Sequence, residues 1–223
     1  MHEVESPRRR APEERPQQII EAALAVFDER GLAGARLEDI ALRAGVAKGT
    51  IYLYFSNKEE LFREVIRTTL VRRLEETRAA FHEPPPDTSA TEQLRQYVRG
   101  WWAFLLTPEY QSVSRLVIGE LHHFPELAAF YSTEVVSRGR TLVSSLVARG
   151  IERGEFRQGD PVIFARMVSS MLVSQSMWVC KQQHFRGLAP YTPDQIVEQV
   201  LDFILHALRA ERTPGAGEGA SHS

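Results

Sequence analysis

The segment 37–61 constrains the fold more than any other part of the chain. Its first half repeats apolar residues at the spacing of one helix face: Leu37, Ile40, Ala41 and Ala44. Gly45 follows where helices commonly end in a left-handed residue, a conformation that glycine adopts without steric cost. The next helix, about 47–54, is too short to be stable alone. A helix, a glycine turn and a short helix of hydrogen-bond donors indicate a helix-turn-helix, whose second helix enters the DNA major groove.

A third helix is expected directly after this unit, over residues 59–82. The pairs Ser56/Glu59 and Asn57/Glu60 both fit a capping box, so two starting positions stay open. Apolar residues then continue at helical spacing until a run of three prolines. A helix of this length spans about 35 Å and can bridge two domains.

The run from Arg15 to Leu61 resembles the DNA-binding domain of TetR-family transcriptional regulators. The matching residues are Ile19, Ala22, Ala23, Phe27, Gly31, Ile40, Ala41, Ala44-Gly45-Val46, Lys48-Gly49-Thr50-Ile51-Tyr52, Tyr54-Phe55, Lys58-Glu59 and Leu61. Many matches at fixed spacing are more specific than a bare helix-turn-helix pattern, whereas the rest of the chain is similar only in its helical pattern and length. The resemblance implies an all-α fold of about nine helices, with an N-terminal three-helix DNA-binding domain and a C-terminal helical ligand-binding and dimerisation domain.

The expected organisation has four parts. They are a disordered arm at 1–12, a helix-turn-helix domain at 13–73 with its motif at about 36–55, a ligand-binding and dimerisation domain at 74–212, and a flexible tail at 213–223. The arm contains Arg8-Arg9-Arg10, which either solubilises the chain or contacts phosphates or the minor groove of DNA.

The second helix of the motif carries most of the candidate DNA contacts. Lys48 is expected to approach a base edge or the adjoining phosphate, and Thr50 a phosphate or a thymine methyl. Tyr52 and Lys58 match family positions that grip phosphates, with packing and helix initiation as their alternative roles. The complete predicted set is Arg36, Arg43, Lys48, Gly49, Thr50, Tyr52, Tyr54 and Lys58.

Residues 35 and 36 depart from the pattern of the resembling family. The family usually places Thr or Ser just before the second helix, where it caps the helix and touches a phosphate. Here Ala35 and Arg36 stand instead, and losing a cap costs about 1 kcal/mol. Arg36 can still reach a phosphate with its own charge, so whether it replaces the usual contact stays open.

The composition is that of an ordinary globular protein. The formal net charge is -2, so DNA binding has to depend on the local placement of bases. The single cysteine, Cys180, excludes an internal disulfide framework and suits the cytoplasm, and no secretory leader pattern opens the chain. No P-loop, nucleophile elbow or zinc-helix motif is found, and the adjacent His122 and His123 make a poor chelate. We therefore expect no enzymatic activity, no cofactor and no metal.

The C-terminal part reads as a series of amphipathic and apolar helices. They are expected at 91–106, 111–123, 126–153, 162–186 and 192–212. The apolar run 161–180 has the length of a membrane span, but Arg166, Gln175 and several serines favour a buried helix or a subunit interface. The resemblance implies a homodimer paired through 162–186 and 192–212, with no membrane contact, and two copies place two reading helices on successive turns of DNA.

Aromatic residues are frequent in the C-terminal part and permit an apolar pocket between helices. The resemblance implies that a small molecule binds there, tilts the long helix 59–82 and releases DNA. We expect a lipophilic ligand. The predicted ligand-binding residues are Trp101, Trp102, Arg115, Glu120, His123, Phe124, Tyr131 and Trp178.

Two functions fit these patterns. The first is a dimeric, ligand-released repressor that binds a palindromic operator through the helix 47–54. The second is a helical ligand-binding or enzymatic protein that has kept a degenerate DNA-binding head. The combination of Lys48, Thr50, Tyr54 and Lys58 favours the first, because a head that no longer binds DNA has no reason to keep it.

Overall fold

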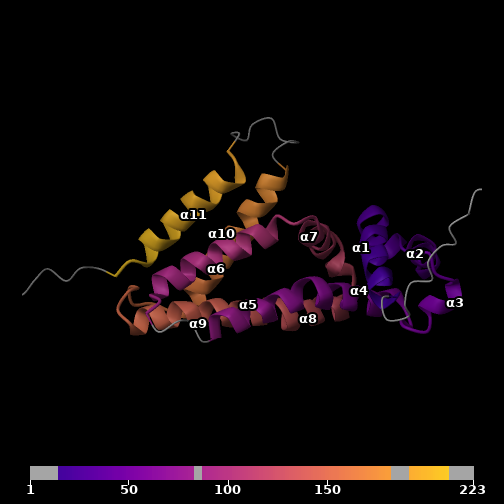
Figure 1. The fold of residues 1–223 in the computed structure, drawn as a ribbon, viewed down its shortest axis with the longest axis horizontal. Helices are drawn as coiled ribbons and strands as arrows, with labels where there is room; N and C mark the ends of the chain where they lie inside the picture. The colour runs from indigo at the N-terminus through magenta and orange to yellow at the C-terminus, as the bar shows by residue number, and fades with distance from the viewer. Residues whose placement is uncertain (1–14, 83–86, 182–190, 211–223) are drawn as a thin grey trace, which may run out of the picture. The chain divides into compact units, whose positions relative to one another are not determined.

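The protein is all-α, as the sequence predicts. The computed structural model describes residues 15–82, 87–181 and 191–210, and these ranges contain helices, turns and one isolated β-bridge but no strand (Figure 1). The predicted arm at 1–12, the tail at 213–223 and the predicted helix ends at 186 and 212 lie outside the described residues.

The helices follow one another with short connections. In chain order they are α1 (Arg15–Gly34), α2 (Leu37–Ala44), α3 (Lys48–Ile51), α4 (Lys58–Ile66), α5 (Arg72–His82), α6 (Ala90–Leu105), α7 (Pro108–Glu120), α8 (Pro125–Tyr131), α9 (Arg138–Glu152), α10 (Pro161–Lys181) and α11 (Pro193–Leu208). π-helical turns join α4 to α5 and α8 to α9 without a break. Counted as continuous, these pairs leave nine helices in the described ranges, which agrees with the prediction.

Two local predictions are refined by the structure. The start of α4 is decided in favour of Asn57, whose side chain accepts a hydrogen bond from the Glu60 amide at 2.7 Å. The reading helix predicted over 47–54 is too long, because α3 spans only Lys48–Ile51. The residues after it form tighter turns, in which Leu53 and Tyr54 donate their amides to carbonyls three positions earlier.

The described chain divides into two compact units. The first unit contains the described residues up to Arg78 together with Leu106–Arg138, and the second contains Ala79–Leu105 and the described residues from Gly139 onward. The first unit therefore extends beyond the predicted domain limit at residue 73, because α7 packs against α1. Phe27 and Phe62 lie in the core of this unit, both fully buried, with ring centroids 5.6 Å apart in an edge-to-face contact.

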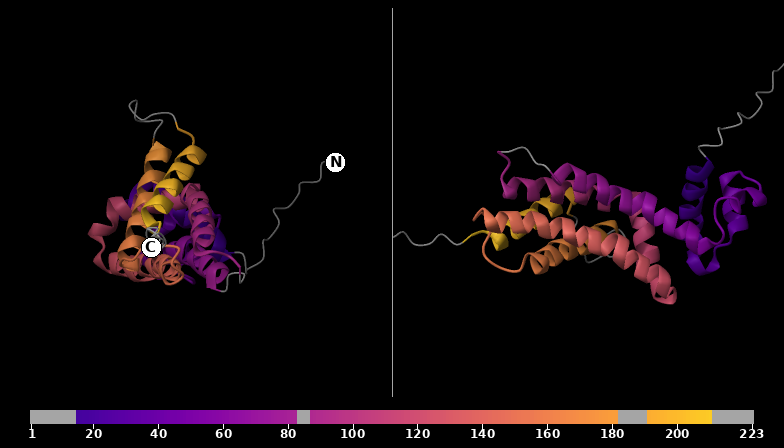
Figure 2. Two further views of the ribbon diagram at one scale, coloured as in Figure 1. Left: turned by 90° about the vertical axis from the view of Figure 1, so that its left-hand side faces the viewer. Right: turned by 90° about the horizontal axis from the view of Figure 1, so that it is seen from below.

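In the second unit, α6 packs against α10 and α11, and Figure 2 shows α10 and α11 running beside each other. The first turn of α6 is capped from a distance by Glu155, whose carboxylate accepts the amides of Ala90 at 2.8 Å and Thr91 at 2.9 Å. Burial acts to raise the pKa of Glu155, but these hydrogen bonds outweigh it and leave the pKa below its ordinary value. The ionised carboxylate thus supplies the acceptor that free amides at a helix start require.

Helix α10 is less buried than its sequence suggests. By length and composition alone Pro161–Lys181 qualifies as a membrane span, but a single such helix is weak support for one, and only 33% of its apolar window is buried in the chain. Val162, Ile163, Met167 and Trp178 are exposed. A helix buried within one chain, the first of the two roles predicted for this segment, therefore does not describe it.

Candidate nucleic-acid interface

The turn between α2 and α3 has the geometry that its glycine requires. Gly45 adopts φ 67° and ψ 29°, in the left-handed region. The Val46 amide donates to the Ala41 carbonyl at 3.0 Å and the Gly45 amide to the Leu42 carbonyl at 3.2 Å. These two bonds form a Schellman motif, which ends α2 sharply and turns the chain into α3.

The short helix α3 is held by its inner face. Ile51 and Phe55 are buried, as predicted, while Lys48, Tyr52 and Tyr54 are exposed. Gly49 faces open space, since a Cβ placed there would meet no atom within 4 Å. Four residues cannot sustain a helix alone, so the two buried side chains fix the direction in which the polar residues point.

Several bases of this region are paired with carboxylates of the same domain. The Lys48 Nζ lies 2.8 Å from Glu38 Oε1, Arg43 lies 2.6 Å from Glu29, and Arg30 pairs with Asp39. Lys48 lowers the pKa of Glu38, and Glu38 in turn raises the pKa of Lys48. Each of these bases is thus neutralised by a nearby carboxylate, so the surface around α3 has no strong positive field.

Arg36 and Lys58 occupy the two ends of the motif. Arg36 is the exposed N-cap residue of α2 and makes no side-chain capping bond, so the predicted loss of the cap is confirmed. The Lys58 Nζ donates to the Ala33 carbonyl at 2.7 Å and to the Ala35 carbonyl at 3.4 Å. Lys58 thus ties α4 to the end of α1 through two of the three donors of its ammonium group.

Sequence reasoning missed two residues beside α3. Glu38 was not assigned a role, although its carboxylate also accepts the Tyr52 hydroxyl at 3.3 Å. Leu53 is 81% exposed between the two tyrosines, so an apolar side chain belongs to the outer surface. No local sequence pattern indicates the contacts of Glu38, because it belongs to α2 and its partners to the segment that begins at α3. The exposure of Leu53 follows from the early end of α3 at Ile51.

Arg115 and Glu120, two of the predicted ligand-binding residues, join α7 to α1. Arg115 contacts Asp28 through two nitrogens at 2.9 and 2.7 Å, and Ser112 donates to the same carboxylate. The Arg115 hydrogen bond lowers the pKa of Asp28. Glu120 accepts the Ala33 amide at 3.0 Å. Both side chains of α7 are therefore bonded to residues of α1 within the first unit.

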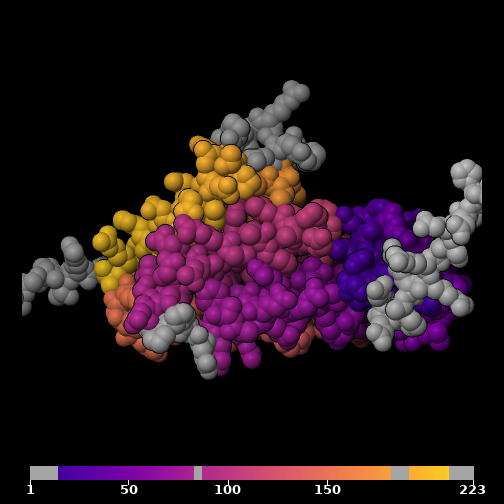
Figure 3. All heavy atoms as spheres, in the orientation of Figure 1, coloured from indigo at the N-terminus to yellow at the C-terminus, as the bar shows by residue number. Residues whose placement is uncertain are grey.

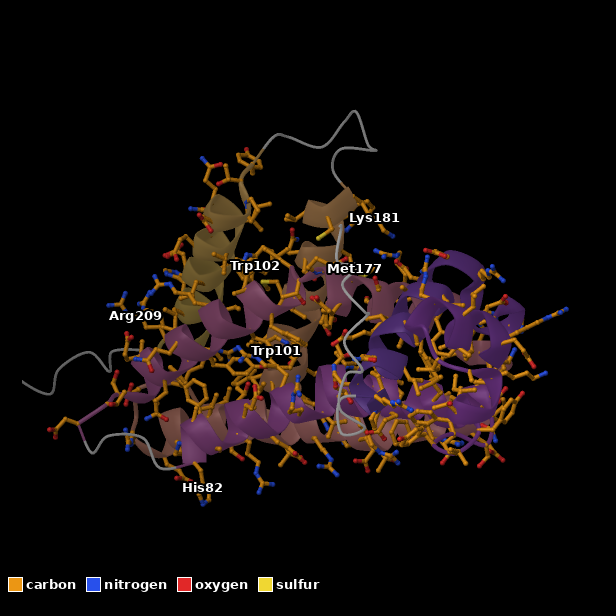
Figure 4. All side chains as sticks on the ribbon, turned by 45° about the vertical axis from the view of Figure 1, so that its right-hand side comes forward. His82, Trp101, Trp102, Met177, Lys181 and Arg209 are labelled. Carbon is orange, nitrogen blue, oxygen red and sulfur yellow. The ribbon has the colours of Figure 1, made fainter. Side chains whose placement is uncertain are left out.

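The predicted ligand-binding residues are divided between the two units. Trp101, Trp102 and Trp178 belong to the second unit, and the other five belong to the first. Trp101 stacks on Tyr97, whereas Trp102 is buried and its indole nitrogen has no hydrogen-bond partner among the described residues. Figure 4 shows both tryptophans on α6, extending in different directions. The structure thus does not bring the eight residues together within one unit.

Two open cavities lie along α10 and α11 of the second unit. Their volumes are about 970 and 530 Å³, and both are lined by Met171, Gln175 and Phe203. None of the predicted ligand-binding residues lines either one. Among the described residues no group of three or more His, Cys, Asp or Glu side chains is placed to hold a metal ion.

A glycine-turned helix pair with a buried inner face and an exposed donor face defines a helix-turn-helix DNA-binding protein. Residues 19–65 match the family profile described as bacterial regulatory proteins of the tetR family, and residues 84–200 match the tetracyclin repressor-like C-terminal domain. The chain therefore belongs to the TetR family. It is a DNA-binding transcriptional regulator and not an enzyme.

Known relatives cover most of the chain. It is 26% identical over 170 residues to the fatty acid metabolism regulator protein of Bacillus subtilis, covering 75% of this chain and 85% of that protein. The structure of the fatty acid degradation regulator FadR from Bacillus halodurans is similar with a TM-score of 0.73 and 28% identity, covering 92% and 100% of the two chains. FadR from Bacillus subtilis in complex with stearoyl-CoA has the same fold, with a TM-score of 0.70 and 24% identity over 86% and 99%.

Gly31 of α1 lies against Glu120 of α7 and has an unusual backbone conformation. It adopts φ 71° and ψ 166°, and a Cβ at this position would overlap the Glu120 carboxylate. Gly31→Ala should lower the free energy of unfolding by about 1–3 kcal/mol through backbone strain alone, as measured by urea denaturation. Gly49→Ala is the matched control, and its effect should stay within about 0.5 kcal/mol. Equal stability of the two variants would contradict the left-handed backbone conformation described for Gly31.

Proposed function

We propose that the chain is a dimeric, ligand-released repressor that binds a palindromic operator through α3. The observation that carries the proposal is the exposed donor surface Lys48–Tyr54, held outward by buried Ile51 and Phe55. Such a surface fits a major groove. The regulator acts on DNA, so we place it in the cytoplasm.

In the proposed complex, Lys48 approaches a base edge or the adjoining phosphate, Thr50 contacts a phosphate or a thymine methyl, and the flanking residues bind phosphates. Phosphate contacts fix the position on the duplex, whereas base contacts select the sequence. The proposed phosphate-binding residues are Arg36, Arg43, Tyr52, Tyr54 and Lys58, and Gly49 allows the backbone to come close. Arg43 has to leave Glu29, and Lys58 uses its remaining donor.

Lys48→Ala should weaken binding to the promoter region beside the gene by about tenfold or more and reduce the salt slope of log K by about 1. The measurement is a gel shift between 50 and 200 mM salt. Arg140→Ala is the control, because it removes one exposed positive charge from the second unit. Equal losses in both variants would show that Lys48 makes no contact. The absence of any band for the wild type at low salt would favour a degenerate head instead.

We propose α10 and α11 as the dimer interface, which supplies the twofold symmetry that a palindrome requires. Exposed apolar side chains along these helices support it: Val162, Ile163, Met167 and Phe203. In Figure 3 atoms of α11, drawn in yellow, lie on the visible surface of the second unit. Contiguous exposed apolar residues on a soluble chain commonly mark a protein interface.

Phe203→Glu should convert the dimer to a monomer in analytical ultracentrifugation, because a carboxylate would have to lose its water inside an apolar interface. Phe203 is 61% exposed in the single chain, so the substitution leaves its fold intact. Ile118→Glu, at an exposed position of α7, is the control and should stay dimeric. A Phe203→Glu variant that remains dimeric would move the interface elsewhere.

We propose a lipophilic effector, bound in the helical domain at 74–212. The aromatic side chains of that domain support this, as do the names of the relatives, which regulate fatty acid metabolism and degradation. The proposed ligand-binding residues are all eight that the sequence predicts: Trp101, Trp102, Arg115, Glu120, His123, Phe124, Tyr131 and Trp178. Binding has to favour the released state over the DNA-bound state for DNA to dissociate.

Stearoyl-CoA, the ligand of FadR from Bacillus subtilis, is the first probe. At about 100 times its dissociation constant it should stabilise the fold by about 2.7 kcal/mol, seen as a rise in melting temperature. It should also release the promoter fragment in the gel shift. Free CoA serves as the control for the nucleotide part, and a rise with free CoA alone would argue against a lipophilic effector.

A further inference from the structure

Glu38 contacts the proposed DNA-binding surface from the preceding helix. It lies in the first turn of α2, and its carboxylate accepts from Lys48 at 2.8 Å and from the Tyr52 hydroxyl at 3.3 Å. Both partners are proposed DNA contacts. One acidic side chain thus occupies two donors of the reading surface before any nucleic acid arrives.

We propose that Glu38 is a specificity-determining residue that competes with DNA for Lys48. The inference rests on the proposed function, in which Lys48 contacts DNA. The pair is open to solvent, with 66% of the Lys48 and 44% of the Glu38 side chain exposed. Exposed ion pairs are weak, so DNA can displace Glu38 wherever it offers Lys48 a better partner.

The competition acts differently on operator and random DNA. Binding to random DNA depends almost wholly on neutralising phosphates and releasing counterions. A lysine already neutralised by Glu38 gains little from a loosely placed phosphate, and the freed carboxylate then faces the negative duplex. A well-placed base edge of the operator gives Lys48 directional hydrogen bonds that offset this loss. Glu38 therefore weakens random binding more than operator binding and raises the ratio of the two.

Other ion pairs of the domain differ from this one in position. Arg43–Glu29 and Arg30–Asp39 join α1 to α2, and neither touches a residue of α3. Asp39→Asn is therefore the matched control, because it removes the same charge from the same helix as Glu38, its partner Arg30 is not a proposed DNA contact, and Lys48 stays paired.

The test is a double-mutant cycle on the full chain: wild type, Glu38→Gln, Lys48→Ala and the double variant. Each is titrated against a promoter fragment that carries the operator and against random DNA of equal length, by fluorescence anisotropy at several salt concentrations. Glu38→Gln should tighten binding to random DNA by about fivefold, tighten operator binding less, and steepen the salt slope by about 0.9. Combined with Lys48→Ala, the substitution should strengthen random binding clearly less than it does alone, because only the repulsion between the carboxylate and the duplex is then removed.

Three results would overturn the inference. An equal gain from Glu38→Gln with and without Lys48, or from Asp39→Asn, would show a general charge effect. A loss of operator binding alone would show that Glu38 reads a base, as a carboxylate does with a cytosine amino group. An unchanged affinity in Glu38→Gln would show no competition. Failure of the proposed function is distinguishable, because Lys48→Ala alone would then leave both affinities unchanged. Unaltered melting temperatures show that the variants fold.

Discussion

The burial of Ile51 and Phe55 behind the Gly45 turn is the constraint on which the remaining structure of the reading surface depends. A four-residue helix has no stability of its own, so its orientation is a product of tertiary packing. Once these two side chains dock into the first unit, Lys48 and the tyrosines have to face outward. The exposed side chains of α3 and the sharp end of α2 at Gly45 therefore define the same outer face of the helix-turn-helix.

Ion pairs around the reading surface, and hydrogen bonds between α1 and α7, are the next features of this unit. The carboxylates of Glu29 and Glu38 offset neighbouring bases, so attraction to DNA depends on exchanging partners rather than on a large positive field. Asp28 and Ala33 of α1 are bonded to α7. These bonds lie within one compact unit and tie α7 to the helix that packs against α2.

The helix-turn-helix could be predicted from sequence because its determinants are local: a glycine after an amphipathic segment, and a capping Asn57. The length of α3 could not, because it depends on the turns that follow. The contacts of Arg115 and Glu120 with α1 could not be predicted either. Their partners in α1 lie 87 residues away in sequence, and no periodic pattern reports a pairing at that separation.

The central claim is that two copies each place α3 in a major groove. Methylation protection of guanine N7, which lies in that groove, tests it most directly on the promoter fragment. Two protected clusters should appear with centres about 10–10.5 base pairs apart, or a multiple of this spacing. A single cluster, or protection confined to adenine N3 in the minor groove, would contradict the account.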